Sequence, residues 1–212
     1  MTTTTETGKG GARGEGAGRV RLSPEQRRTQ LLELGVQLLS ERAVDEISID
    51  LLAEHAGVSR GLVHHYFGTL VGYREAVVRH WVDQLIEATA PPAEGEPLER
   101  LLASLTVYVD YVVANYAGYV SIVRGAAGGT EVMREIYEEA RSALTDRIFR
   151  EDAQGELLPD NPASRLVVRG WSAMVEETVL TWKEDPTGVS RDELLTMLAG
   201  SLPALIEMMP GD

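Results

Sequence analysis

Apolar residues recur every three to four positions along most of this chain, and no stretch shows the alternation of a half-buried strand. The pattern predicts an all-α protein of about nine helices. The first helix should begin sharply, because Ser23 can cap it, Pro24 suits its first position and Gln26 completes a capping box. The helices are expected at about 23–42, two short ones within 48–67, 71–88, 98–116, a short one bracketed by breaks around Gly118 and at Gly125 to Gly129, 133–148, 162–183 and 190–208.

The two short helices within residues 48–67 are separated by a tight turn. Ser48 is suited to capping the first of them, and Gly57 tolerates the left-handed backbone that ends a helix. Val58 supplies an apolar plug in the turn, and Ser59 can cap the second helix by accepting a hydrogen bond from a free backbone N–H. This arrangement is a helix-turn-helix, whose second helix is built to lie in a DNA major groove.

The chain resembles the TetR-type transcriptional regulators in the run IDLLAEHAGVSRGLVHHYF, residues 49–67. The local motif covers roughly residues 23–80, and the rest matches in length, in helical pattern and loosely in the last two helices. The resemblance implies a three-helix DNA-binding domain over residues 23–70. It also implies a larger helical ligand-binding and dimerisation domain over residues 71–212.

A recognition helix reads base edges with the side chains at its exposed start. Arg60 can donate two hydrogen bonds to guanine, Gly61 allows close approach, and Leu62 can contact a thymine methyl group. Val63 and Phe67 are four residues apart and are expected in the core. The resemblance implies a DNA-reading role for Arg60, Gly61, Leu62, His64, His65 and Tyr66, although Tyr66 could also pack partly against the first helix.

Further contacts to the DNA backbone are expected at helix starts. Ser48 and Ser59 stand at helix N-termini, where free N–H groups and the helix dipole favour an anion. Arg27 near the start of the first helix, together with Arg28, can add a clamp on the phosphates.

One position departs from the family pattern. The family usually places a Lys three residues after the Phe, where it reaches a phosphate, and here that position is Leu70. One charged contact per subunit is therefore missing, so DNA affinity and its salt dependence should be lower than in a typical member. Arg74 or the N-terminal arm could compensate.

The formal net charge of −13 at first argues against a nucleic-acid partner. Residues 1–80, however, hold ten Lys or Arg and ten Asp or Glu, whereas residues 81–212 hold ten and twenty-three. A phosphate-binding surface must therefore be local to the first part, and the acidic remainder should keep DNA away. Residues 1–22, rich in Thr and Gly, are expected to be a disordered arm, or alternatively a basic arm that follows the phosphates or the minor groove.

The last two predicted helices carry extensive apolar stripes. They are too wide for helices that cover one small domain, so they favour a homodimer. A dimer would place two recognition helices about one DNA turn apart and require a near-palindromic operator. The stripes are Val167, Val168, Trp171, Val175, Val179 and Trp182 on the first helix and Leu194, Leu195, Leu198, Leu202, Leu205, Ile206 and Met209 on the second.

A pocket for a small-molecule effector is expected in the second part, because several aromatic and polar residues share helix faces there. For each of them, ordinary core packing is the alternative. Glu176 and Glu177 could recognise a cation or could form a solvated face. The expected ligand-binding residues are Trp81, Ser104, Tyr108, Tyr111, Trp171 and Met174, with Asn115 on the same polar face. The effector's identity does not follow from them.

These features favour a dimeric one-component transcriptional regulator, a repressor that a small molecule releases from double-stranded operator DNA. Repression is implied by the resemblance alone. One alternative is a DNA-binding regulator without a ligand, with an architectural role or control by a partner. The other is an all-α enzyme, which no nucleophile–base pattern, metal motif or phosphate loop supports.

Several kinds of site are not expected. The chain has no Cys, so a thiol nucleophile or a disulfide framework is excluded. His64 and His65 are adjacent in a helix and point about 100° apart, so we expect no metal site. No cofactor is expected. The absence of an apolar run of about 18 residues and of a signal-peptide pattern predicts a cytoplasmic protein without a membrane partner.

Overall fold

The structure is a computed structural model that describes residues 22–128, 130–152, 158–186 and 188–209. Those residues form nine α-helices and one 3-10 helix and contain no strand, which confirms the all-α prediction. The elements are α1 (Pro24–Glu41), η1 (Val44–Glu46), α2 (Ile49–Ala56), α3 (Arg60–Phe67), α4 (Leu70–Ala88), α5 (Pro97–Ala114), α6 (Tyr116–Gly128), α7 (Glu131–Glu151), α8 (Pro162–Glu184) and α9 (Arg191–Glu207). Apart from Leu22, the predicted arm lies outside the described residues.

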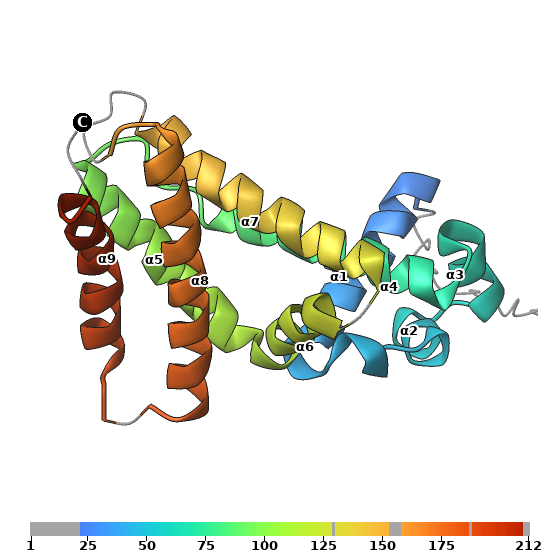
Figure 1. The fold of residues 1–212 in the computed structure, drawn as a ribbon. Coiled ribbons are helices and arrows are strands. Elements are labelled where there is room, and N and C mark those ends of the chain that lie inside the picture. The colour runs from blue at the N-terminus through green and yellow to red at the C-terminus, as the bar shows by residue number, and fades with distance from the viewer. Residues whose placement is uncertain (1–21, 129, 153–157, 187, 210–212) are drawn as a thin grey trace, which may run out of the picture.

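The helices form an elongated molecule with different structures at its two ends (Figure 1). The short helices α2 and α3 lie at one end with α1, and α8 and α9 pack together at the other. The long helices α4 and α7 run side by side between them, and α6 contacts both α1 and α7. We call α1, η1, α2 and α3 the DNA-reading unit, and α4 to α9 the body.

The DNA-reading unit has a small core of its own. Ser23 begins α1 with the predicted capping box, accepting from the N–H of Gln26 at 3.1 Å while Gln26 accepts from the Ser23 N–H at 2.9 Å. Tyr73 of α4 is fully buried and donates its hydroxyl hydrogen to the Leu31 carbonyl of α1 at 3.0 Å. A buried hydrogen bond of this kind fixes α4 against the unit. The fully buried residues of its core are Leu31, Leu39, Ile47, Leu52 and Val63.

The break expected around Gly118 lies earlier, at Asn115. Asn115 ends α5, and both its backbone N–H and its side-chain amide donate to the Tyr111 carbonyl, at 3.0 and 2.8 Å. Gly118 lies inside α6, where a Cβ atom would stand only 2.4 Å from the carbonyl oxygen of Leu39. The glycine is therefore required for the backbones of α6 and α1 to touch, and it was misread as a helix breaker.

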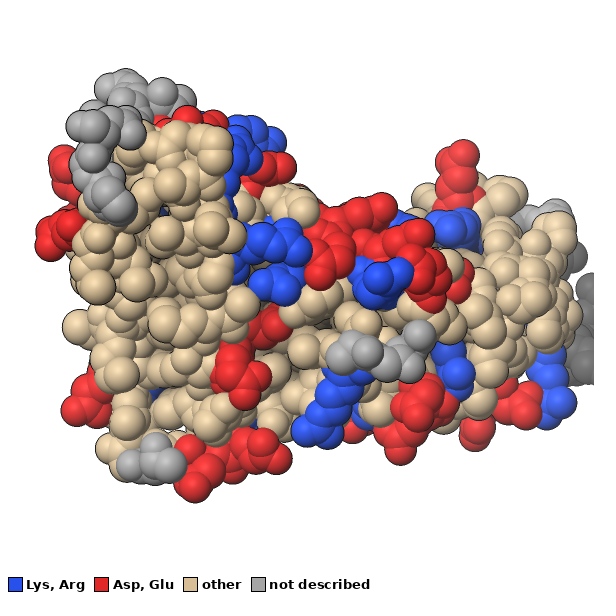
Figure 2. Space-filling view, in the orientation of Figure 1, with Lys and Arg blue, Asp and Glu red and all other residues tan. Residues whose placement is uncertain are grey.

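The apolar stripes of α8 and α9, which were expected to form a dimer contact, are largely covered within this chain. Most of their residues are buried within this chain, because α8 and α9 pack on each other and on α5. The surface that these helices leave outward is a different one and carries few charges (Figure 2). It includes Leu166, Gly170 and Met174 of α8, Met197, Gly200 and Ala204 of α9, and Met208, the residue that follows α9, all exposed.

Candidate nucleic-acid interface and ligand cavity

The helix-turn-helix is built by the caps that its sequence predicts. The Ser48 hydroxyl accepts from the Leu51 N–H at 3.1 Å and starts α2. Gly57 ends α2 with a φ of 62°, the left-handed conformation that a side chain would disfavour. The Ser59 hydroxyl then accepts from the Leu62 N–H at 3.3 Å and starts α3. Both hydroxyls therefore order helix starts, beside which further backbone N–H groups remain for an anion.

Helix α3 turns one face into the core and another to solvent. Val63 is fully buried, and the ring of Phe67 packs edge-on against Tyr73 with centroids 4.9 Å apart. Leu62 and Tyr66 are half-buried between these faces, so Tyr66 has the mixed environment that its sequence allowed. The residues of α3 that are exposed are Arg60, Gly61, His64 and His65.

Arg60 already has an ionic partner in the absence of DNA. Its guanidinium pairs with the carboxylate of Asp50 on α2, and both side chains remain largely exposed. An exposed ion pair of this kind contributes little, about 0–1 kcal/mol, so Arg60 can exchange Asp50 for a base at small cost. Arg28 lies over the Phe67 ring at 5.3 Å, and Arg27 donates to the Gln30 side chain at 2.6 Å.

His64 has one ring nitrogen committed and one free for DNA. Its Nδ1 lies 2.9 Å from the carbonyl oxygen of Gly68, at the end of α3. A carbonyl only accepts, so Nδ1 carries the hydrogen in this geometry. Nε2 then remains as the atom that can contact a base or a phosphate.

The start of α4 shows how the chain accommodates Leu70. Thr69 caps the helix by accepting from the Gly72 N–H at 3.0 Å, and Leu70 is half-buried. Arg74, which could compensate for the missing cation, donates from Nε to the Ile47 carbonyl at 3.0 Å and from Nη2 to the Asp45 carbonyl. Its guanidinium binds the segment before the helix-turn-helix, and compensation by Arg74 is therefore not supported.

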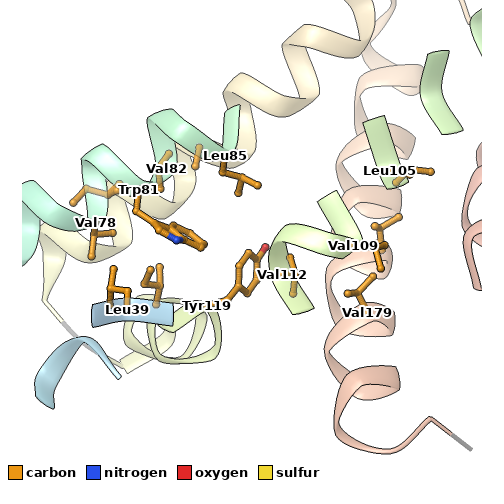
Figure 3. Close-up of a cluster of buried hydrophobic side chains, with 14 of the residues drawn as sticks. Leu39, Val78, Trp81, Val82, Leu85, Leu105, Val109, Val112, Tyr119 and Val179 are labelled. Carbon is orange, nitrogen blue, oxygen red and sulfur yellow. The ribbon is translucent and has the colours of Figure 1, made fainter. Parts of the chain in front are cut away.

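A cavity of about 180 Å³ lies within the body between α4, α5, α6, α7 and α8. One water needs roughly 10–15 Å³, so the space is large enough for a small organic molecule. Figure 3 shows Trp81 of α4 and Tyr119 of α6 facing each other, with Val112 of α5 beside Tyr119. Aliphatic side chains from all five helices form most of the rest of the lining.

Four of the six predicted ligand residues line this cavity, namely Trp81, Ser104, Tyr108 and Trp171. Tyr111 is not among the lining residues; its ring lies 5.3 Å from that of Trp81 and its hydroxyl donates to the Trp81 carbonyl at 3.4 Å. Met174 is 39% exposed and lies on the outward surface of α8. These two residues therefore lie outside the cavity lining, because helical periodicity does not separate a residue beside a cavity from one behind its wall.

A hydrogen-bond network that we call the tyrosine cluster (Tyr108, Tyr119, Tyr137 and Glu176) forms one side of the cavity. The hydroxyls of Tyr108 and Tyr119 are 2.8 Å apart, and Tyr119 donates to Glu176 Oε2 at 2.9 Å. Tyr137 donates to the other oxygen, Oε1. Burial raises the pKa of each of these tyrosines above its ordinary value, so all three keep their hydrogens at neutral pH.

The sequence interpretation left Tyr119 and Tyr137 out of the site. Tyr137 lies within the helix expected at 133–148, for which no site residue was proposed, and Tyr119 lies next to a glycine interpreted as a helix break. Glu176 lines the cavity, where it could recognise a cation, whereas Glu177 is exposed and belongs to a solvated face.

Two arginines line the other end of the cavity. Arg147 is buried and donates to the Ile86 carbonyl at 2.6 Å and to the Thr89 hydroxyl at 3.1 Å, at the end of α4. Arg100 donates to the Pro92 carbonyl at 2.7 Å and pairs with Glu151 at 2.6 Å. Both guanidiniums thus hold the ends of helices together.

The described residues also bear on metal binding and on membrane insertion. They contain no group of three or more His, Asp or Glu side chains placed to hold a metal ion. None of their helices is long and apolar enough to cross a membrane.

Two family models match the chain. The model of bacterial regulatory proteins of the tetR family matches residues 31–69, and that of the tetracyclin repressor-like C-terminal domain matches residues 97–204. The HTH-type transcriptional activator FasR of Mycolicibacterium smegmatis is 23% identical over 81% of this chain and 79% of its own length. The HTH-type transcriptional regulator BetI of Vibrio parahaemolyticus is 23% identical over 80% of this chain and 87% of its own.

Solved structures show the same fold. A tetR-family transcriptional regulator from Streptomyces coelicolor is 33% identical, with a TM-score of 0.76 over 87% of this chain and 82% of that one. FadR from Bacillus subtilis, solved in complex with stearoyl-CoA, is 16% identical, with a TM-score of 0.62 over 86% and 99%. The latter likeness concerns the fold alone. With both parts of its length matched, the chain belongs to the TetR family of DNA-binding transcriptional regulators.

Proposed function

We propose that this chain is a homodimeric repressor that binds a near-palindromic operator through α3 and is released by a small molecule in the body. The observation that carries the proposal is the sharing of helices between the two sites. The cavity is walled by α4 and α6, and both of these helices also contact the DNA-reading unit. A ligand that favours a different position of either helix would bias the orientation of α3.

Contacts to DNA are assigned by position on the unit. Arg60, His64 and His65 are exposed on α3 and reach bases or phosphates, while Gly61 allows the helix into the groove. Leu62 and Tyr66 lie at the edge of the contact. Ser48, Ser59 and Arg27 lie at or near helix starts and contact the backbone of the operator. The proposed DNA-binding domain is residues 23–70, and the proposed ligand-binding and dimerisation domain is residues 71–212.

Two routes connect the cavity to the DNA-reading unit. Along α4, Trp81 and Leu85 line the cavity, and Tyr73 is bonded to α1 about two to three turns earlier. Along α6, Tyr119 lines the cavity, while the adjacent Gly118 touches Leu39 of α1. Ser121 of α6 adds a bond by accepting from the Val44 N–H of η1 at 3.0 Å, so α6 contacts the unit at two points.

The exposed surface of α8 and α9 is the proposed dimer contact. Its outward residues are small or apolar and include Gly170 and Gly200, which let two helices approach closely. The family precedent supports a dimer, and DNA as target supports a cytoplasmic location. Stearoyl-CoA in the related FadR structure supports a body that accepts small molecules. FasR is named an activator, so whether this chain represses is to be tested directly.

The test uses the full chain and the DNA upstream of its own gene. Sedimentation at micromolar concentration should give a dimer, and fluorescence anisotropy should show salt-dependent binding to one near-palindromic site. A transcriptional reporter should rise when the protein is absent. A stable monomer, or equal affinity for scrambled DNA of the same length, would contradict the proposal.

A further inference from the structure

The hydrogen bonds of the tyrosine cluster all point toward Glu176. Tyr137 and Tyr119 donate to its two oxygens, and since Tyr119 has spent its only hydrogen, the contact between Tyr108 and Tyr119 requires Tyr108 to donate. Every phenolic hydrogen is therefore used within the cluster. What remains toward the cavity is acceptor capacity on Tyr108 and on the carboxylate, which a ligand can use only by donating or by carrying positive charge.

The charge of Glu176 is not neutralised nearby. No Lys, Arg or His of the described residues lies within ion-pair distance of it. Arg141, which also lines the cavity, stacks on the Tyr137 ring with its guanidinium carbon 5.5 Å from the centroid. Arg100 and Arg147 are bonded to carbonyls at the other end. Glu176, like the lining cations Arg141 and Arg147, thus has no ion-pair partner among the described residues, and in a mostly apolar space the attraction between its carboxylate and a cation is stronger than in water.

Aromatic rings surround the space beside Glu176. The ring centroid of Tyr119 lies 5.5 Å from that of Trp81 and 6.3 Å from that of Tyr108, and both pairs of rings pack edge to face. Such rings attract cations through their faces. Trp81 also has an unusual feature: its indole N–H is buried and has no partner among the described residues. Because this atom is inaccessible, an occupant of the cavity can contact the faces of the rings but not the indole N–H.

From these observations, which rest on the proposed function, we infer that the effector is a cationic amphiphile whose positive group contacts Glu176 within the tyrosine cluster. Its aliphatic tail lies along α7 toward Arg147. From Tyr137 to Arg147 is ten residues of one helix, or about 15 Å, so the cavity suits an extended tail. Leu85, Leu101 and Ile148 supply the apolar lining for it.

Three probes with the same decyl tail test the charge preference: decyltrimethylammonium, the neutral N,N-dimethyldecanamide and decanoate, each below its micellar concentration. Binding to the full chain is measured by titration calorimetry and by the fluorescence of Trp81 and Trp171, which both line the cavity. We expect the cation to bind at least about ten-fold more tightly than either other probe, the range that a desolvated cation–π and ionic contact supplies.

Two matched variants locate the effect. Glu176→Gln keeps the shape and removes the charge, and should weaken binding of the cation by about ten-fold while changing binding of the amide by less than about two-fold. Glu177→Gln removes an exposed charge from the adjacent position and should change neither. Thermal unfolding of each variant establishes that it is folded. The ranking of the three probes on the unaltered chain needs no variant at all.

The inference is overturned if decanoate or the amide binds as tightly as the cation, or if folded Glu176→Gln binds the cation like the unaltered chain. Failure of the proposed function is seen separately, in the operator titration. Tight cation binding that leaves operator affinity unchanged would support the ligand class and contradict release by ligand. Release of the operator by decanoate alone would support release and overturn the ligand class.

Discussion

The DNA-reading unit and the cavity of the body present their functional side chains in opposite ways. The unit directs the residues of one eight-residue helix, α3, outward from a fixed core. The cavity collects residues inward from five successive helices, α4 to α8, spread over residues 81–176. The first site is therefore specified by local rules of capping and periodicity, while the second depends on how long helices meet. Evolution can alter one base contact with one substitution, but a change of effector must keep several helices packed.

The largest expected effect lies at the tip of the unit. Replacing Arg60 by Ala in both subunits should cost about 1–3 kcal/mol of operator binding per half-site and relax the base preference there. Arg79→Ala is the control, because Arg79 is an exposed cation of α4 paired with Glu139 of α7, away from α3. Anisotropy titrations measure both. Equal losses would mean that Arg60 acts only through long-range charge.

One added side-chain atom on α6 should disrupt the contact between the DNA-reading unit and the body. Gly118→Ala places a Cβ atom against the Leu39 carbonyl, and overpacking of this kind should destabilise the fold by about 1–3 kcal/mol. Gly125→Ala, in the same helix with nothing near its Cβ position, should be neutral or stabilise by up to about 1 kcal/mol. Urea unfolding at a fixed protein concentration distinguishes them. The same midpoint for both would contradict the close contact.

Binding to DNA phosphates should be strengthened by a substitution at Leu70, the first residue of α4. Leu70→Lys is expected to tighten operator binding and to steepen its logarithmic salt dependence by about one unit per added contact. Leu70→Gln controls for the loss of apolar surface without adding charge. Titrations at several salt concentrations measure the slope. An unchanged slope would show that the side chain does not reach a phosphate.

A smaller effect is expected from the pair that restrains Arg60. Asp50→Asn should free Arg60 and raise operator affinity by the equivalent of at most about 1 kcal/mol, the value of an exposed ion pair. Glu54→Gln removes an exposed charge from the same helix without touching Arg60. Competition binding can compare the two. If both raise affinity equally, general repulsion and not the pair is responsible.

Sequence reasoning succeeded where structure is local. Ser23, Ser48, Gly57 and Ser59 cap the helices that they were expected to cap, since capping depends on a few neighbouring residues. Four lining residues of the cavity were found because each followed helix periodicity.

It failed where two segments meet. A glycine such as Gly118 is often found where a helix breaks, and only the position of the α1 backbone shows that it is needed for a close contact between helices. Tyr119 belongs to the cavity because α6 faces Trp81 (Figure 3). The apolar stripes of α8 and α9 are wide because these helices pack on α5 as well as on each other. Helical periodicity alone could not identify α5 as the helix that covers them.

The adjacency of Gly118 and Tyr119 matters to anyone who would turn this protein into a biosensor. One position must remain without a side chain, because it abuts the DNA-reading unit, and the next faces the effector. A mutant library for new effector specificity should therefore randomise Tyr119, Tyr108 and Tyr137 while holding Gly118 constant. Random mutagenesis that changes both codons at once would lose variants with a useful effector specificity, because a side chain at position 118 would disrupt the contact with the DNA-reading unit.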